Sequence, residues 1–357
     1  MSDPRWKELA EILICYSTDT KPGDRVLISM IESETLPLAR AVYAQAIKVG
    51  AFPYVEFHSA YLERDLMNFG SMQQCEWVPE IQAAAIEWAD VYLSLRGARN
   101  PHEFSNIGSE KFVAHRQAMG KVSALRTEQS RWVIVRVPNE AFAQQAGMSL
   151  DEAVDLFFEA TLCDWTSEAE KYAAIQKVFQ AAETVHIVGD RTELSFLTKG
   201  RKYLIEDGHI NMPGGEIFTA PVEDSVEGKI YFEFPGVFFG QKVEGIQLEF
   251  SGGSVVKANA ESNVDLLREL IKMDPGANRV GEFGVGTNER IQRCCNDLLY
   301  DEKMGGTIHL ALGRAYKDCG GINQSSLHWD IVKDMRTNGV IFLDNKKVFE
   351  TGRFYLD

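Results

Sequence analysis

The pattern of hydrophobic and polar positions changes character about halfway along the chain. In the first half, compact apolar runs alternate with longer segments that carry apolar residues at helical spacing. The runs predicted to form buried strands are 25–30, 54–57, 91–95 and 132–137, and the predicted helices are 33–49 and 79–89. Strands separated by helices of this length favour a mostly parallel, right-handed α/β sheet.

The pattern is helical from 149 to 182, and we expect a domain boundary near the end of this stretch, at residue 185. Beyond it, short segments alternate polar and apolar residues between glycines, which is typical of antiparallel strands and hairpins. These segments are 185–188, 192–196, 228–233, 243–250 and 252–256, and one predicted helix, 263–273, interrupts them. The sequence therefore predicts an α/β domain over 1–185 and a sheet-rich α+β domain over 186–357.

The composition is compatible with two folded domains, since 45% of the 357 residues are hydrophobic. Lys and Arg total 37 against 52 Asp and Glu, and the formal charge of -15 makes nucleic acid and anionic membranes poor partners. We find no secretory signal pattern, which has positively charged residues followed by an apolar core. We also find no run of roughly 18 apolar residues that could span a membrane. We expect a cytoplasmic protein whose six cysteines, which lack C-x-x-C spacing, are reduced.

Two of the seven histidines lie close together in the second half. His309 belongs to the apolar run 308–312, where a lone histidine is more often a core residue than a ligand. His328 is followed by Trp329 and Asp330, and residues i and i+2 of a strand project to the same face. An imidazole and a carboxylate can therefore reach one metal ion together from this segment.

Two carboxylates stand beside glycines in the same half of the chain. Glu216 lies in the segment 213–221 and Glu282 in the segment 281–288, and we interpret both as glycine-rich turns. Backbone without side chains can bring such a carboxylate close to a ligand, although Glu216 also fits an ordinary surface turn. The segment 281–288 lacks the G-x-G-x-x-G order of a dinucleotide-binding loop.

Imidazole and carboxylate ligands in this combination suit Zn, Co, Mn or Fe(II) and do not choose among them. Two such ions about 3.5–4 Å apart, bridged by a carboxylate and a water, lower the pKa of that water and polarise a carbonyl. This is the chemistry of aminopeptidases. The sequence therefore predicts a metalloenzyme with its site in the second domain.

These residues resemble the M29 family of metalloaminopeptidases, the group of aminopeptidase T and aminopeptidase S. The motifs that carry the resemblance are 215–221, 223–225, 281–283, 301–313, Tyr316 and 328–330, whereas the first half matches only in general α/β character. The resemblance implies two divalent ions, Zn, Co or Mn. It implies as their ligands Glu216, Glu282, His309, His328 and Asp330, with Glu302 as a further ligand or an adjacent carboxylate.

The resemblance also implies roles for two catalytic residues. Glu282 is expected to bridge the ions, and Tyr316 to lie beside them and donate a hydrogen bond to the carbonyl oxygen under attack. The implied activity is the removal of N-terminal amino acids from small peptides or amino-acid amides by a homodimer.

Two other interpretations compete with this one. A related branch, the 2,5-dihydroxypyridine dioxygenases, has a mononuclear Fe(II) site that would here use His328, Asp330 and His309. That branch lacks a carboxylate at the position of Glu216 and has a histidine at that of Glu282, so the two glutamates favour the peptidase pattern. The other alternative is a metal-stabilised binding protein that catalyses no reaction. In its version without a metal, His309, His328 and Asp330 are ordinary sheet residues.

Overall fold

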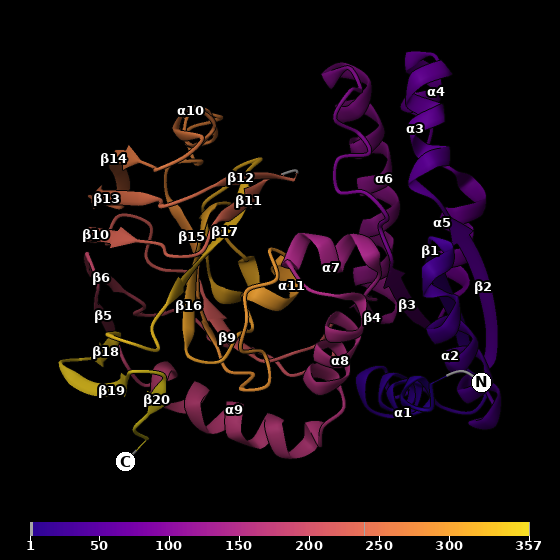
Figure 1. Ribbon diagram of the computed structural model, residues 1–357, viewed down its shortest axis with the longest axis horizontal. Helices are drawn as coiled ribbons and strands as arrows, with labels where there is room; N and C mark the ends of the chain where they lie inside the picture. Colours follow the sequence, from indigo (N-terminus) through magenta and orange to yellow (C-terminus); the bar gives the residue numbers. More distant parts are fainter. Residues whose placement is uncertain (1–2, 239, 357) are drawn as a thin grey trace. The chain divides into compact units, whose positions relative to one another are not determined.

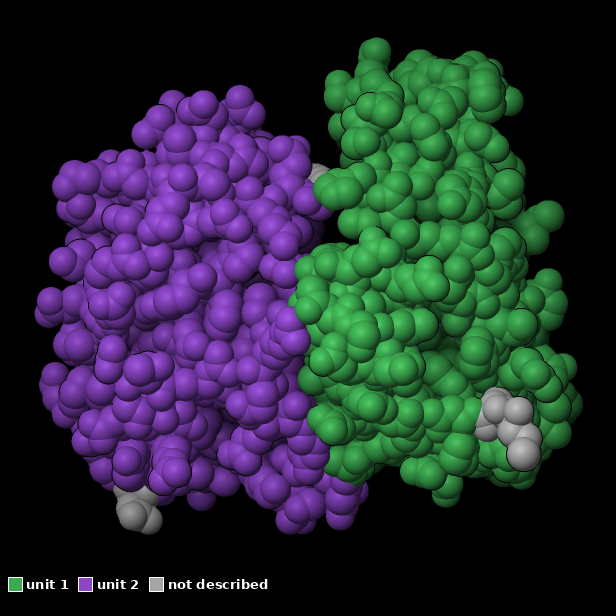
Figure 2. All heavy atoms as spheres, viewed as in Figure 1, with its two compact units in different colours: residues 1–163, 208–213 green, residues 164–207, 214–357 purple. Residues whose placement is uncertain are grey.

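The computed structural model describes residues 3–238 and 240–356. The chain forms two compact units, which Figure 2 colours separately. Unit 1 comprises Met1–Cys163 and Gly208–Pro213, and unit 2 comprises Asp164–Asp207 and Gly214–Asp357. The chain therefore enters unit 2, returns briefly to unit 1 and then completes unit 2.

Unit 1 is built on a five-stranded sheet in the order β2-β1-β3-β4-β8, in which all neighbours are parallel (Figure 1). The strands are β1 (Arg25–Ile31), β2 (Phe52–His58), β3 (Val91–Arg96), β4 (Arg131–Arg136) and β8 (Asn211–Met212). The predicted parallel α/β sheet is confirmed. The short strand β8 was not predicted, because it comes from the second half of the chain.

Helices connect the parallel strands and flank them. Within unit 1 the helices are α1 (Arg5–Glu11), α2 (Leu36–Lys48), α3 (Ala60–Phe69), α4 (Met72–Cys75), α5 (Glu80–Trp88), α6 (Ser109–Gln129), α7 (Glu140–Ala146) and α8 (Leu150–Thr161). Ile86 of α5 and Val122 of α6 pack against Leu27 of β1 and Tyr92 of β3. These contacts place α5 and α6 on one face of the sheet.

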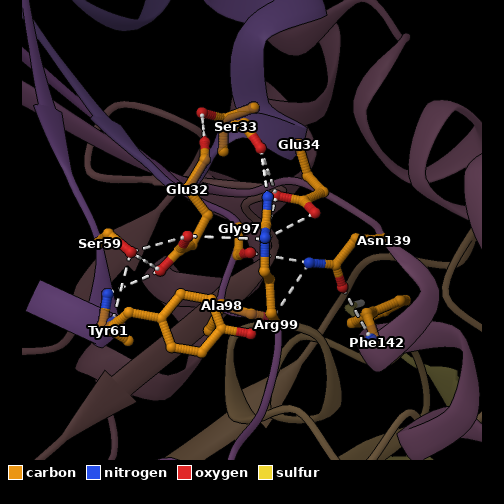
Figure 3. Close-up of polar contacts among 12 residues, drawn as sticks. Glu32, Ser33, Glu34, Ser59, Tyr61, Gly97, Ala98, Arg99, Asn139 and Phe142 are labelled. Atoms are coloured by element: carbon orange, nitrogen blue, oxygen red, sulfur yellow. Dashed lines mark hydrogen bonds and ion pairs between the residues drawn. The ribbon is translucent and has the colours of Figure 1, made fainter. Parts of the chain in front are cut away.

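A polar network joins the loops at the carboxyl ends of β1, β2 and β3 (Figure 3). Glu32 follows β1, is 2% exposed and has a φ of 69°, which is rare for a residue with a side chain. Its carboxylate accepts hydrogen bonds from Ser59 Oγ at 3.0 Å and from the Ala60 backbone N–H at 2.7 Å. Arg99 Nε lies 3.6 Å from the same carboxylate, so the buried charge of Glu32 is compensated locally.

The network continues to the loop after β4 through Asn139. Its Nδ2 donates to the carbonyl oxygens of Gly97 and Ala98 at 2.8 and 3.0 Å, and its Oδ1 accepts from the Phe142 N–H and so caps α7. The loops after the three central strands are thereby held in fixed positions.

Unit 2 contains two large sheets, as the alternating pattern of the second half predicted (Figure 1). The eight-stranded sheet contains β14 (Ser254–Asn259), β13 (Gln247–Ser251), β10 (Glu227–Tyr231), β6 (Thr192–Leu197), β5 (Thr184–Gly189), β18 (Val340–Leu343), β19 (Lys346–Glu350) and β20 (Arg353–Phe354). The five-stranded sheet contains β17 (His328–Asp334), β16 (Thr307–Gly313), β15 (Val280–Gly286), β9 (Glu216–Thr219) and β7 (Leu204–Glu206). The remaining elements are the pair β11 (Gly236–Phe238) and β12 (Gln241–Val243) and the helices α9 (Trp165–Gln180), α10 (Val264–Leu270) and α11 (Leu298–Asp301).

The main hydrophobic core of unit 2 receives side chains from both large sheets. Phe196 and Ile230 come from the eight-stranded sheet, and Phe283 and Leu310 come from the five-stranded sheet. Because side chains alternate along a strand, every second residue of the five-stranded sheet faces this core. The residues between them face the other way, and the candidate ligands belong to that second set.

Two of the predicted segments are interrupted in the structure. The predicted strand 243–250 is interrupted at Gly245, whose φ of 61° ends β12 before β13 begins. The long helical stretch is broken between α8 and α9, where the side chain of Asp164 caps α9.

The unit boundary also lies elsewhere than the boundary predicted at residue 185. It precedes α9, because Ile175 and Phe179 of this helix belong to the core of unit 2. Among the described residues, no helix combines the length and the apolar character that crossing a bilayer requires.

Candidate metal centre

The strand register of the five-stranded sheet brings the predicted ligands together. Glu282 pairs with Ala311, and Ala311 pairs with Asp330, so the two carboxylates flank one residue of β16, the strand between β15 and β17. His309 lies two residues before Ala311, on the same face. Glu216 pairs with Gly286 at the start of β9. Four strands distant in sequence thus point their ligands to one side of the sheet.

A bulge sets the direction of Glu282. The register shifts between Val280 and Glu282, so that Gly281 is the additional residue on β15. Val280 and Phe283 both face the core, which regular alternation does not permit. The bulge shifts the alternation of side chains along β15 by one residue. Glu282 therefore points to the side of the sheet that carries the other candidate ligands.

The glycines near Glu282 are required by close packing and not by a turn. We predicted a glycine-rich turn here, which is wrong, because the segment is the fully buried strand β15. A Cβ added at Gly284 would lie 2.1 Å from the ring of His309, and one at Gly281 would lie 2.3 Å from the carbonyl oxygen of Gly313. The imidazole of His309 therefore lies directly over a residue without a side chain.

Glu216 is likewise part of a strand. It opens β9, is 5% exposed and does not lie in a surface turn. Gly215 before it has a φ of 123° and lies against Asn288, where an added Cβ would be 2.5 Å from the side chain. Only glycine readily adopts this backbone conformation so close to Asn288. It allows the chain to enter β9 with Glu216 buried.

The two carboxylate oxygens of Glu282 face two different histidines. Oε1 lies 3.3 Å from Nε2 of His309, and Oε2 lies 3.5 Å from Nε2 of His328. His309 Nε2 also lies 3.4 Å from Glu216, and His328 Nε2 lies 3.4 Å from Asp330. Two groups of three donors result, Glu216-Glu282-His309 and Glu282-His328-Asp330, and within each group the donor atoms lie within 4.8 Å of one another.

The ring of His328 is oriented by the backbone. Its Nδ1 lies 2.8 Å from the carbonyl oxygen of Arg314, which can only accept, so Nδ1 carries the proton. Nε2 is then left with a free lone pair when the ring is neutral. Fixing the tautomer in this way is a common feature of metal-binding histidines.

Lys303 and Glu302 add charge beside Glu216, and Lys303 was not predicted as a site residue. Lys303 is completely buried, and its Nζ lies 3.2 Å from Glu216 and also contacts Glu302. Burial acts to lower the pKa of Lys303, but Glu216 and Glu302 outweigh it and raise the pKa, so the ammonium stays charged. Glu302 joins neither group of three and contacts the centre through Lys303. Hydropathy gives no sign of a buried lysine, so the sequence offered no signal for this contact.

The site carries more buried negative charge than its own hydrogen bonds satisfy. One carboxylate oxygen of Glu216 and one of Asp330 are buried without a hydrogen-bond partner, as is Nδ1 of His309. Burial raises the pKa of Glu216 and Asp330, and it raises the pKa of Glu302 to about 7. Burial acts to lower the pKa of His309, yet Glu282 and Glu216 raise it to about 9. Buried carboxylates that lack partners beside imidazole nitrogens fit divalent cations.

Tyr316 lies at the border of this cluster. Its ring is 5.2 Å from that of His328 and 5.6 Å from that of Phe218, and the residue is 43% exposed. Burial, followed by the charges of Glu282 and Asp330, raises the pKa of the phenol. The hydroxyl therefore stays protonated at neutral pH and is available as a donor. The structure thus brings together five predicted ligands and places Tyr316 next to them.

Comparisons with known proteins match this chain over nearly its whole length. The family described as Thermophilic metalloprotease (M29) matches residues 2–354. The match includes the first half of the chain, in which the sequence motifs gave only a general α/β resemblance. Aminopeptidase 2 of Geobacillus stearothermophilus is 24% identical, with 98% of each chain covered. Aminopeptidase T of Thermus aquaticus is 27% identical, with 68% of this chain and 67% of the relative covered.

Two solved structures share the fold along the whole chain. Wild-type AmpT from Thermus thermophilus has a TM-score of 0.84 at 24% identity, with 98% of each chain covered. The 2,5-dihydroxypyridine dioxygenase from Pseudomonas putida KT2440 has a TM-score of 0.66 at 16% identity, with 98% of this chain and 96% of the other covered. At such identities the likeness is one of fold, whereas the family match extends over nearly every residue. The chain therefore belongs to the M29 family of metalloproteases.

Proposed function

We propose that this metal-dependent aminopeptidase works with a pair of divalent ions bridged by Glu282. The observation that carries the proposal is the placement of the two Glu282 oxygens, one 3.3 Å from His309 and the other 3.5 Å from His328. A carboxylate whose two oxygens face two different histidines is suited to bridge two cations. Glu216 and His309 would hold one ion, and His328 and Asp330 the other.

The donor set of imidazoles and carboxylates suits Zn, Co or Mn. When bound, a pair of such ions lowers the pKa of a water and polarises the carbonyl of the first peptide bond. The remaining tasks belong to the chain itself. His328 is held in the productive tautomer by Arg314, and Lys303 holds Glu216 and Glu302 in place. Glu302 acts in this scheme as an adjacent carboxylate and not as a direct ligand.

Tyr316 is proposed to act on the substrate. Because its phenol keeps its proton, it donates a hydrogen bond to the carbonyl oxygen as negative charge develops there. The side chain is 43% exposed, so a substrate can reach it from solvent. We further propose a cytoplasmic homodimer that hydrolyses small peptides or amino-acid amides.

Metal analysis of the protein purified without added metal, combined with a hydrolysis assay, tests the proposal. We expect two ions per chain and hydrolysis of leucine amide after loading with Zn, Co or Mn. N-acetylated leucine amide, whose amine is blocked, is the control and should not be hydrolysed. One iron per chain with oxygen uptake on 2,5-dihydroxypyridine would contradict it. So would full activity after complete removal of metal.

A further inference from the structure

Unit 1 contains a cleft that the proposed peptidase chemistry does not use. It has a volume of about 330 Å³ and lies between the parallel sheet and helices α5 and α6. Its floor is unusually polar for the inner face of an α/β sheet, because Ser29, Tyr92 and Ser94 line it. A sheet face that packs only against helices is normally apolar, so these residues indicate a space meant for a polar group.

The strongest indication of a ligand is His115 on α6. This side chain lines the cleft and is only 4% exposed, and neither ring nitrogen has a hydrogen-bond partner. Oε2 of the Glu63 carboxylate lies 3.6 Å from Nε2, beyond hydrogen-bond distance. Burying a polar group without a partner costs free energy. A molecule in the cleft that accepts a hydrogen bond would remove this cost.

Arg126, also on α6, presents a second unsatisfied donor. Its Nε is buried without a hydrogen-bond partner, and the guanidinium lies over the rings of Trp132 at 4.3 Å and Tyr92 at 5.7 Å. Burial lowers its pKa, and no carboxylate among the described side chains counteracts this. Stacking on aromatic rings fixes the guanidinium plane and leaves its N–H groups for an anion.

The charges around the cleft favour an anion. Arg96, Arg116 and Arg126 line it, together with His58 and His115. The acidic residues facing these groups are Glu63, which lines the cleft, and Glu56, which lies 2.9 Å from His58. The guanidinium groups therefore exceed the carboxylates, in a chain whose formal charge is -15. Apolar side chains of Ile86, Met119 and Val122 form the rest of the wall.

The location of the cleft supports the same conclusion. Ile31 and Arg96, the last residues of β1 and β3, lie at its edge, and these strands are neighbours in the sheet. The sheet order runs from β1 to β2 on one side and from β3 to β4 on the other, so the direction in which successive strands are added reverses between β1 and β3, although the strands are parallel. Ligands of open α/β sheets bind outside the carboxyl ends of strands at such a switch point. The Glu32 network of Figure 3 holds the adjoining loops rigid.

We propose that this cleft binds a small organic anion, a carboxylate or a phosphate carried on an apolar body. His115, Arg116 and Arg126 bind the anionic group, and Ile86 and Met119 contact the apolar body. The volume is at the lower end of the roughly 300–1,000 Å³ of known ligand sites, which restricts the ligand to a small molecule. The site is separate from the metal ligands, all of which belong to unit 2.

Isothermal titration calorimetry on the full-length, metal-loaded protein tests the proposal with phenyl phosphate, benzoate and neutral benzyl alcohol. We expect saturable binding of one or both anions, and the stronger of the two identifies the anionic group. Benzyl alcohol should not bind. The substitutions His115→Gln and Arg126→Gln should each weaken binding at least about tenfold, because each removes a charge-assisted hydrogen bond.

The matched control is Lys121→Gln, which removes a charge from an exposed position of the same helix and should leave binding unchanged. Arg116, which is exposed, supplies the variant Arg116→Gln in case a buried substitution prevents folding. The variant Glu282→Gln separates this cleft from the metal centre, since binding should survive there. Binding lost in Glu282→Gln but kept in His115→Gln would overturn the proposal, as would equal binding of benzyl alcohol or no binding of either anion.

Discussion

Glu32 in unit 1 and Glu216 in unit 2 are both buried carboxylates, 2% and 5% exposed, yet their surroundings differ. Glu32 accepts hydrogen bonds from Ser59 and Ala60 and lies beside Arg99. Glu216 has one oxygen on Lys303 and the other without a hydrogen-bond partner, facing His309. Burial alone therefore does not identify a functional carboxylate. What distinguishes the metal centre is an incomplete set of partners, which a cation completes.

The largest effect is expected from Glu282→Gln, which removes the charge of the proposed bridge but keeps the size of the side chain. In the proposed site both ions would lose a ligand, so hydrolysis should fall to the background of the assay and metal affinity should fall more than about 100-fold. Elemental analysis and leucine amide hydrolysis measure the two effects. Glu269→Gln, on the exposed face of α10, is the control. Full metal occupancy in Glu282→Gln would contradict the bridging role.

Substitution of Tyr316 separates substrate contact from metal binding. We expect Tyr316→Phe to lower kcat by about 10²–10³-fold, the usual effect of losing one oxyanion donor, while the metal content stays unchanged. Steady-state kinetics and metal analysis on the same sample give the answer. Tyr355→Phe, also at an exposed tyrosine, should behave as the unsubstituted protein does. A loss of metal in Tyr316→Phe would show that the ring supports the ligands instead.

Gly284→Ala tests whether activity depends on the exact position of the His309 ring. The added Cβ would lie 2.1 Å from the imidazole, so the ring must shift. A displacement of about 1 Å at such a site lowers activity by roughly 10²-fold. Activity assays with Gly108→Ala as control, where an added Cβ meets nothing within 4 Å, check this expectation. Unchanged activity in Gly284→Ala would mean that the ring tolerates displacement.

Metal affinity should increase with pH, because protons compete with cations for the same atoms. The pKa of His309, a proposed ligand, is raised to about 9, so this imidazole is largely protonated between pH 6 and pH 8 in the metal-free protein. Raising the pH to 8 favours the metal-bound form by about tenfold per pH unit for each proton released. Competition titrations with Mn²⁺ at pH 6, 7 and 8 measure this slope. Equal affinity across that range would refute it.

The smallest effect concerns Glu32, the carboxylate whose partners are complete. Glu32→Gln leaves one oxygen as acceptor but removes the charge, and we expect the free energy of unfolding to fall by about 1–3 kcal/mol. Metal content should not change. Chemical denaturation, with the exposed Glu87→Gln as control, measures the difference. If Glu32→Gln lost its metals, the contrast between the two carboxylates would fail.

Local patterns in the sequence predicted much of this protein. Apolar runs placed β1, β3 and β4, and the alternation in the second half indicated a sheet-rich unit. The spacing of His328 and Asp330 was enough to predict a shared face, because side-chain direction alternates along any strand. The approach of these two side chains to 3.4 Å agrees with that prediction.

Other features were decided only by the tertiary structure. The glycines around Glu282 indicated a turn, but strand β15 needs them because His309 and the chain around Gly313 leave no room for side chains. Lys303 enters the site through packing that no periodicity records. The physical reason is that periodicity reports the direction of a side chain relative to its own strand, whereas strand order, bulges and close approaches depend on residues far away in the sequence. The sequence thus determined which residues have the chemistry, and the fold decided which atoms they meet.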